Sequence, residues 1–213
     1  MQNTTTNTPL LDAILDGEGW DEEIKRAFYA LCVGRLMTKA GEHDEWPVAP
    51  IIHGEDNTGA ALIARCVIPH LAPSVYKVPR PGDGSVNMSE AFDSDLVLVR
   101  TGIHGAPTFS KEEMLAMIHG ETVVISRRHA LPLESKWTTR VVMVGHSLPS
   151  WFHQRQGRDV LLFYFSKALK TQEIDLESEM PAIFEKGRQC YLQLVKKVGS
   201  EGDVRAALSP YLY

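Results

Sequence analysis

The sequence predicts an α/β fold, in which a mainly parallel β-sheet is flanked by helices and the C-terminal part is helical. Apolar, strand-like runs alternate with helix-like runs along the chain, which is the pattern of a parallel sheet. Residues 95–100 (Asp-Leu-Val-Leu-Val-Arg) form a continuous apolar run, typical of a strand buried on both faces. Residues 54–59 form a loop bounded by glycines between the first strand and the following helix, where helix N-terminal amides can meet a phosphate.

Local patterns predict the individual elements. Residues 1–20, which begin with a Thr/Asn-rich stretch, are expected to form a flexible tail, and residues 21–213 a single domain. Acidic residues in a first turn, followed by apolar residues at helical intervals, predict a helix over 21–37. Further helices are predicted over 60–70, 110–118, 174–186 and 187–198, and strands over 48–53, 95–100, 140–145 and 159–165.

Two elements have sharper local signals. Ser110 is followed three residues later by Glu113, which is the capping-box pattern at the start of a helix. Residues 122–125 and 131–133 flank a polar tip, residues 126–129 (Ser-Arg-Arg-His), in the manner of a β-hairpin. Arg127 and Arg128 at this tip are candidates for contacts with a nucleic-acid backbone, and a solvated turn is the equally favoured alternative.

Composition narrows the class of protein. The 213 residues are 44% hydrophobic and 23% charged, as in ordinary globular domains. A net charge of −5 argues against a generally basic surface, so any contact with nucleic acid must be local. Three separated cysteines and eight scattered histidines form no disulfide framework or metal motif. The polar start is not a targeting peptide, and no apolar run approaches the roughly 20 residues of a membrane span. We expect a cytoplasmic or nuclear protein with no membrane partner.

The 54–59 loop has the spacing of a Walker A motif, G-x-x-x-x-G-K-[ST], without its chemistry. Ala60 and Ala61 stand in place of the lysine and the magnesium-binding hydroxyl. The loop is either a nest of phosphate-binding amides or a plain strand-to-helix turn. The turn is the preferred interpretation, because Glu55 and Asp56 would repel anions.

Several short segments occur in an order that points to one family. They are residues 34–37 (Gly-Arg-Leu-Met), 41–48 (Gly-Glu-His-Asp-Glu-Trp-Pro-Val), 50–54 (Pro-Ile-Ile-His-Gly), 119–121 (His-Gly-Glu), 145–151 (Gly-His-Ser-Leu-Pro-Ser-Trp) and 179–184 (Glu-Met-Pro-Ala-Ile-Phe). Together they resemble the ATPase domain of superfamily 3 helicases, in the poxvirus-type primase-helicase branch of large DNA viruses and phages. The resemblance covers about residues 22–199. It implies a P-loop, AAA+-like ATPase fold, a hexameric ring and a place in DNA replication.

The resemblance also implies which positions have lost their chemistry. The family's lysine and hydroxyl correspond to Ala60 and Ala61, its acidic residue to Gly102, and its sensor asparagine to His146. Its arginine pair survives only as Arg158. What remains of the nucleotide loop is Gly54, Asn57, Thr58 and Gly59. Phosphoryl transfer depends on such charges, and an arginine finger alone contributes roughly 10³–10⁵ in rate. We therefore expect no catalytic residues and no cofactor.

These observations favour a catalytically degenerate helicase-like protein, a pseudo-ATPase of viral or mobile-element origin. It would act as a scaffold or nucleic-acid-associated component, located in the cytoplasm or nucleus or associated with a virus. Its expected partners are further copies of itself, in a ring, or other assembly subunits, together with a DNA or RNA backbone contacted by Arg127, Arg128 and His129. The alternative is an active ATP-dependent DNA helicase domain that uses ATP and Mg²⁺, natural or with mutated Walker A residues. A third reading is a nucleic-acid-binding module without ATPase activity.

Overall fold

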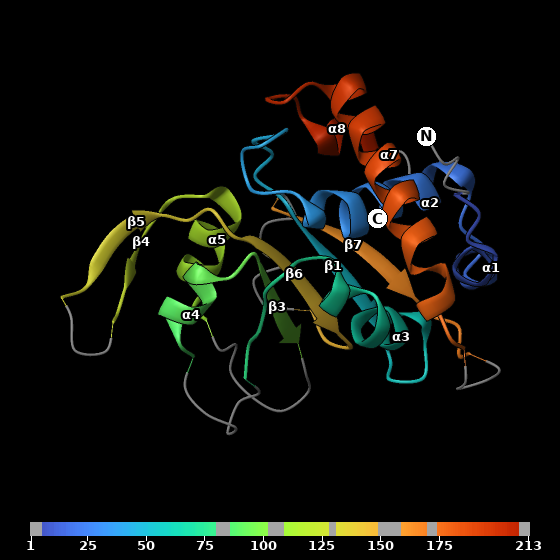
Figure 1. Cartoon of the computed structure of the whole chain (residues 1–213), viewed down its shortest axis with the longest axis horizontal. Coiled ribbons are helices and arrows are strands. Elements are labelled where there is room, and N and C mark those ends of the chain that lie inside the picture. Colours follow the sequence, from blue (N-terminus) through green and yellow to red (C-terminus); the bar gives the residue numbers. More distant parts are fainter. Residues whose placement is uncertain are drawn as a thin grey trace.

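Five parallel strands form the central sheet in the computed structural model of the chain (Figure 1). The structure describes residues 6–79, 86–101, 109–127, 131–148, 159–169 and 174–208. In sheet order the strands are β2 (Val75–Lys77), β3 (Leu96–Thr101), β6 (Arg140–Gly145), β1 (Ala49–Gly54) and β7 (Val160–Phe165). Every neighbouring pair is parallel. The predicted α/β class, with helices flanking a parallel sheet and a helical C-terminal part, is confirmed.

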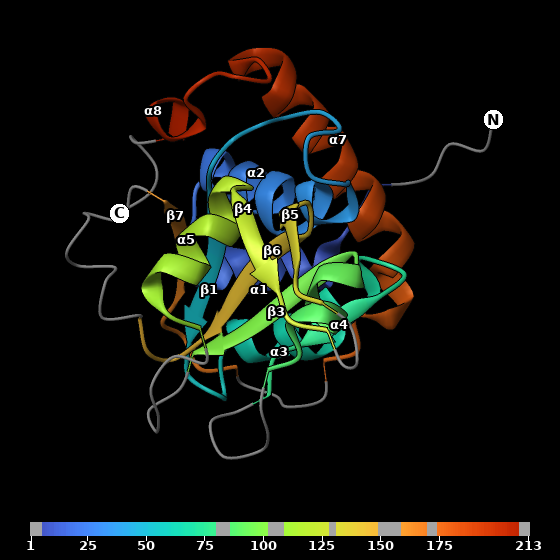
Figure 2. The same ribbon diagram turned by 90° about the vertical axis from the view of Figure 1, so that its left-hand side faces the viewer.

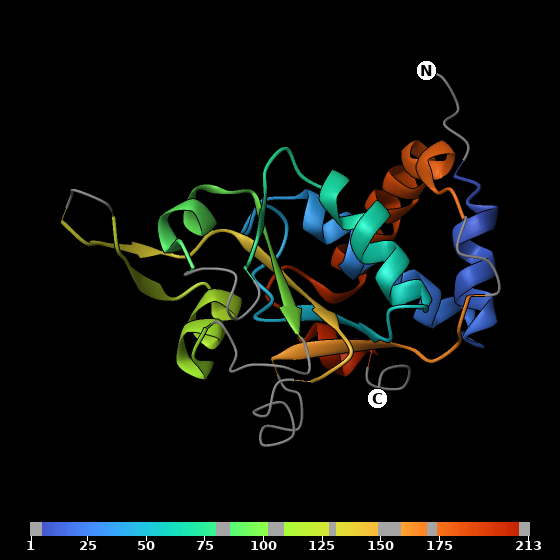
Figure 3. The same cartoon turned by 90° about the horizontal axis from the view of Figure 1, so that it is seen from below.

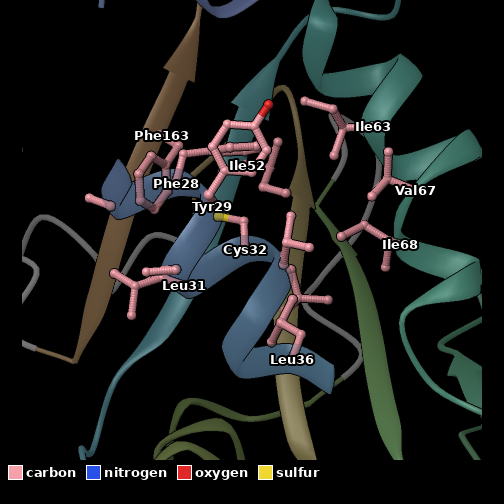
Figure 4. Packing of buried hydrophobic residues seen from close by; sticks show 14 of the residues in the cluster. Phe28, Tyr29, Leu31, Cys32, Leu36, Ile52, Ile63, Val67, Ile68 and Phe163 are labelled. Carbon is pink, nitrogen blue, oxygen red and sulfur yellow. The ribbon is translucent and has the colours of Figure 1, made fainter. Parts of the chain in front are cut away.

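Alternate residues of the strands face two separate hydrophobic clusters. Ile52 of β1 belongs to the larger cluster, with residues of α1 (Pro9–Gly17), α2 (Glu22–Phe28) and α3 (Gly59–Cys66). Figure 4 shows this side, where Phe28 and Leu36 lie with Ile52, Phe163 and Ile63. The neighbouring Ile51 belongs to the smaller cluster, with residues of α4 (Met88–Asp93) and α5 (Lys111–His119). Since both faces are covered, the strands carry apolar residues on both sides, as the run at 95–100 predicted.

The helix predicted over 21–37 is present and changes its winding along its length. It continues from α2 through the π-helix η1 (Tyr29–Gly34) into the 3₁₀ turn η2 (Arg35–Met37). Helix α7 (Met180–Val198) packs against η1 and α2 on one face of the sheet (Figure 2). The prediction of two helices, 174–186 and 187–198, is wrong, because α7 runs without a break through Gly187. A 3₁₀ turn, η4 (Glu177–Glu179), precedes it and α8 (Val204–Leu208) follows.

The predicted flexible tail over residues 1–20 is wrong for residues 9–17, which form α1. Leu11 and Leu15 of this helix are fully buried. The carboxylate of Glu179 accepts hydrogen bonds from the N–H groups of Leu10 at 2.7 Å and Leu11 at 3.1 Å. These are orphan donors at the start of a helix, so a residue 168 positions away in sequence caps α1. A local pattern cannot reveal a cap of that kind.

The remaining elements largely follow their sequence signals. Helix α5 begins with the predicted capping box, in which Ser110 Oγ accepts the Glu113 N–H and Glu113 accepts the Ser110 N–H. The predicted hairpin consists of antiparallel strands β4 (Thr122–Ile125) and β5 (Leu133–Lys136), with β5 ending three residues later than expected. The 3₁₀ turn η3 (Ile68–His70) completes the helical stretch predicted over 60–70. Within the described part of the chain, no helix is both long and apolar enough to cross a membrane.

Candidate functional site

The 54–59 loop joins β1 to α3 at the carboxyl edge of the sheet, which is where open α/β sheets bind ligands. It is closed on itself as a tight turn. The N–H of Thr58 donates to the carbonyl of Glu55 at 3.0 Å, and Thr58 Oγ1 donates to the same oxygen at 2.7 Å. Thr58 is only 3% exposed. Its amide and hydroxyl are therefore committed to hydrogen bonds within the loop.

The segment after β7 holds this turn from outside. Leu169 donates its N–H to the carbonyl of Asn57 at 2.8 Å, and Ala168 forms a β-bridge with Thr58. Glu18, just beyond α1, accepts hydrogen bonds from the N–H of Ser166 at 2.8 Å and the N–H of Lys167 at 3.0 Å. A carboxylate of the chain itself thus occupies the backbone donors next to the loop. Glu55 and Asp56 on the loop are both exposed, which adds negative charge where ATP phosphates would approach.

Packing explains the glycines of the loop without a phosphate. A Cβ on Gly54 would lie 2.5 Å from Thr58 Oγ1 and 2.7 Å from the carbonyl oxygen of Phe165. A Cβ on Gly59 would lie 2.6 Å from Ile14 Cγ2. Ala60, at the position of the Walker lysine, is 1% exposed and belongs to the larger hydrophobic cluster. Ala61, at the position of the metal-binding hydroxyl, is half-buried.

Other residues at the carboxyl edge supply imidazoles and a hydroxyl. His53 of β1 and Thr101 of β3 are both in register with Gly145 of β6, and His146 follows directly. His53 Nδ1, Thr101 Oγ1 and His146 Nε2 are buried atoms without a hydrogen-bond partner in the described structure. Burial is the largest cause and lowers the pKa of His53, against the opposing effect of the Glu55 charge. His53 is therefore neutral at neutral pH and adds no positive charge for phosphates.

The other predicted site residues divide into two groups. Arg127 is exposed just beyond β4, at the end of the hairpin that extends from the body of the molecule (Figure 3). Gly102, Arg128, His129 and Arg158 lie outside the described residues. Among the described residues, no group of three or more His, Cys, Asp or Glu side chains is placed to hold a metal ion.

Sequence reasoning missed a second polar cluster, at the amino edge of the sheet. Arg35, Asp44 and Arg140 are all buried, and both arginines donate to the carboxylate of Asp44, as does the phenol of Tyr191. The sequence did offer one signal for this cluster, namely charged residues within or next to apolar segments. Arg35 directly follows the buried run of η1, and Arg140 is the first residue of an apolar strand.

Comparison with solved structures identifies the fold. Three structures of the NrS-1 C-terminal region superpose with TM-scores of 0.59, 0.55 and 0.54, at 16%, 15% and 15% sequence identity. These three structures have the same fold as this chain. The match covers 87%, 87% and 86% of this chain but only 45%, 45% and 44% of theirs, so the chain spans less than half of their length. No protein-family model and no curated protein matches the sequence.

Proposed function

We propose that this chain is a helicase-like protein of viral origin that does not hydrolyse ATP and serves as an assembly or nucleic-acid-associated component. The observation that carries the proposal is the closed 54–59 loop, with the Thr58 amide and hydroxyl bonded to Glu55. The fold shared with the C-terminal region of NrS-1, a phage primase-helicase, supports the helicase-like part. The ordered segments that resemble superfamily 3 helicases support the viral origin.

The loss of hydrolysis follows from electrostatics. Catalysis of phosphoryl transfer depends on positive charge and a metal ion placed around the phosphates. Ala60 and Ala61 provide neither a cation nor a metal ligand, while Glu55 and Asp56 bring negative charge to the loop. ATP would therefore meet repulsion where an active relative offers lysine and Mg²⁺.

Nucleotide binding and turnover test the proposal directly. We expect no saturable binding of Mg·ATP by calorimetry and no phosphate release above the blank, with or without single-stranded DNA. The double variant Ala60→Lys, Ala61→Ser, checked for folding by circular dichroism, should also fail to bind, because Thr58 still closes the loop. Saturable Mg·ATP binding and DNA-stimulated hydrolysis by the unaltered protein would instead establish an active helicase ATPase.

The assembly role is tested by mass in solution. We expect particles several times heavier than the 23.7 kDa chain, in light scattering or native mass spectrometry, with DNA present or absent. A monomer at every concentration, also in the presence of DNA, would contradict a role based on self-association.

A further inference from the structure

A cavity of about 210 Å³ lies at the amino edge of the sheet, at the opposite end of the strands from the 54–59 loop. Ala49 and Arg140, the first residues of β1 and β6, form part of its wall. Its polar and aromatic lining residues include Arg35, Asp44, His119, Lys136, Trp137 and Arg140. Three cationic side chains, those of Arg35, Lys136 and Arg140, therefore line one partly open cavity.

The cluster of Arg35, Asp44 and Arg140 beside this cavity does not balance its own charges. Arg35 Nη2 donates to Asp44 Oδ1 at 2.8 Å, and Arg140 Nη2 donates to Asp44 Oδ2 at 3.1 Å. Two guanidinium groups and one carboxylate leave an excess of one positive charge. Asp44 also accepts the Trp46 N–H and the Tyr191 hydroxyl. An uncompensated buried charge is strongly unfavourable, and a neutral water molecule in the cavity would not cancel it.

Arg140 has unused hydrogen-bonding capacity at the cavity. It is 7% exposed, and its Nη2 donates to the carbonyl of Lys39 at 3.2 Å as well as to Asp44. Its Nε–H is buried and has no partner in the described part of the chain. A buried donor without a partner is energetically unfavourable. Arg35 is different, because its Nε and both terminal nitrogens donate to Asp44 or to backbone carbonyls.

The surroundings of Arg140 also disfavour its charged form, as its pKa shows. Burial, followed by the nearby charge of Arg35, lowers the pKa of Arg140 to about 10, against the opposing effect of Asp44. The guanidinium still carries its charge at neutral pH, but in a setting that disfavours it. An anion next to Arg140 would reverse that penalty.

The other charged groups around the cavity interact with one another or are exposed. His119 Nε2 lies 2.7 Å from Asp159 Oδ1 and its Nδ1 lies 3.4 Å from Glu121 Oε1, so these groups already interact with one another. Lys136 is exposed on the wall and adds a further positive charge. Glu45 is the remaining acidic lining residue, and it is also exposed.

We propose that this cavity is a binding site for a small oxyanion, a carboxylate or phosphate group, held by Arg140 with Lys136 at the exposed wall. The anion supplies the missing negative charge and an acceptor for the buried Nε–H. Carboxylate and phosphate oxygens suit the planar donors of a guanidinium. The volume of about 210 Å³ is below the roughly 300–1,000 Å³ of sites for larger ligands, so the site fits a compact anionic group better than a whole nucleotide.

The test begins with the unaltered protein and two probes, sodium phosphate and sodium acetate, each compared with sodium chloride at equal ionic strength. We expect a saturable rise in Tm with at least one probe. In ¹H–¹⁵N NMR spectra, the Trp137 indole and the Gly120 amide should shift, while the amides of Gly54 and Gly59 stay in place. A response to phosphate alone identifies a phosphate ligand, a response to acetate alone a carboxylate ligand, and a response to both a general oxyanion site.

Variants then locate the anion. Arg140→Lys keeps the charge and removes the Nε–H, and it should weaken binding about tenfold or more. Arg65→Lys, the same substitution at an exposed position on α3, should bind as the unaltered protein does. If Arg140→Lys does not fold, Lys136→Gln at the exposed wall should weaken binding instead. The proposal is overturned if neither anion differs from chloride, if the shifts map to Gly54 and Gly59, or if no cavity variant weakens binding.

Discussion

At the scale of single residues, stability at the amino edge of the sheet depends on Asp44. Its carboxylate is the anion that both buried guanidinium groups share. Asp44→Asn should lower the free energy of unfolding by about 3–5 kcal/mol, because it leaves two buried cations without a counter-charge. Urea denaturation measures the change. The matched control is Asp56→Asn on the exposed loop, which should stay within about 0.5 kcal/mol. Equal effects of the two substitutions would show that Asp44 does not compensate the buried charge.

Asp12 and Asp44 also determine how the protein responds to acid. Burial raises the pKa of both carboxyls, but their hydrogen-bonding and charged partners, chiefly Lys186 for Asp12 and Arg35 for Asp44, together lower both values below the ordinary 3.8. The folded state then binds fewer protons than the unfolded state. The stabilisation is complete above pH 3.8 and is lost as the pH falls through the lowered values. Urea midpoints from about pH 6 down to about pH 3 should fall accordingly.

The contribution of Asp12 can be separated by removing its partner. Lys186 Nζ lies 2.7 Å from Asp12 Oδ2, and Lys186→Met breaks this ion pair. The variant should lose less stability on acidification than the unaltered protein, since the pKa of Asp12 then moves back towards its ordinary value. An unchanged acid profile would exclude this pair as a source of the pH dependence.

The sequence alone identified those site residues that belong to a short, contiguous motif. Ala60 and Ala61 are visible as soon as the glycine spacing is recognised. The closure by Thr58 depends on a carbonyl three residues back and on a bridge to Ala168, far along the chain. Arg140 and Asp44 are 96 positions apart, so their contact follows only from the order of the strands. Side-chain identities were readable from the sequence, and the pairing between distant segments was not.

At the scale of elements, the helix whose capping signal lies within its own sequence was predicted best. Helix α5 carries its capping box within four residues, and the prediction was right. Helix α7 was divided at Gly187, where glycine is normally unfavourable inside a helix. The structure gives this glycine a tertiary role, because a Cβ on it would lie 2.5 Å from Val33 Cγ1. A Cβ on Gly34 of η1 would likewise overlap the Gly187 backbone. The two glycines allow α7 and η1 to approach closely.

Gly187→Ala tests this packing against helix propensity. Alanine favours an exposed helix by about 1 kcal/mol over glycine. We nevertheless expect a loss of about 1–3 kcal/mol in unfolding free energy, because the methyl group overpacks the contact with Val33. Gly17→Ala at the end of α1 is the control, since a Cβ there meets nothing within 4 Å and should be neutral or slightly stabilising. A stabilising effect at both positions would refute the close-approach role.

At the scale of the whole molecule, the two ends of the parallel strands differ in the charged residues that surround them. The carboxyl edge has a strand-loop-helix arrangement in which Thr58 bonds within the loop, Glu18 occupies backbone donors beside it, and the loop carboxylates are exposed. The amino edge gathers buried arginines around a cavity. The apolar runs were enough to predict β1, β3, β6 and β7, but the three-residue edge strand β2 was missed because it is too short to show a pattern. The charged residues found at each end of the strands come from segments that are distant in the sequence. A hydrophobic pattern does not show which of these segments come together.

The hairpin β4–β5 extends away from the body and carries exposed Arg127 (Figure 1), so we test it as the predicted contact with nucleic acid. With a net charge of −5, the chain needs such a local contact to bind a polyanion.

Each phosphate contact to a single strand contributes about −0.7 to the slope of log affinity against log salt. Arg127→Ala with Arg128→Ala should weaken binding to labelled single strands about equally for all sequences, and flatten the slope by about 1.4. Fluorescence anisotropy at several salt concentrations measures both quantities, with Arg26→Ala and Arg65→Ala as an exposed control pair. Unchanged affinity and slope in the hairpin variant would exclude the hairpin as the nucleic-acid contact.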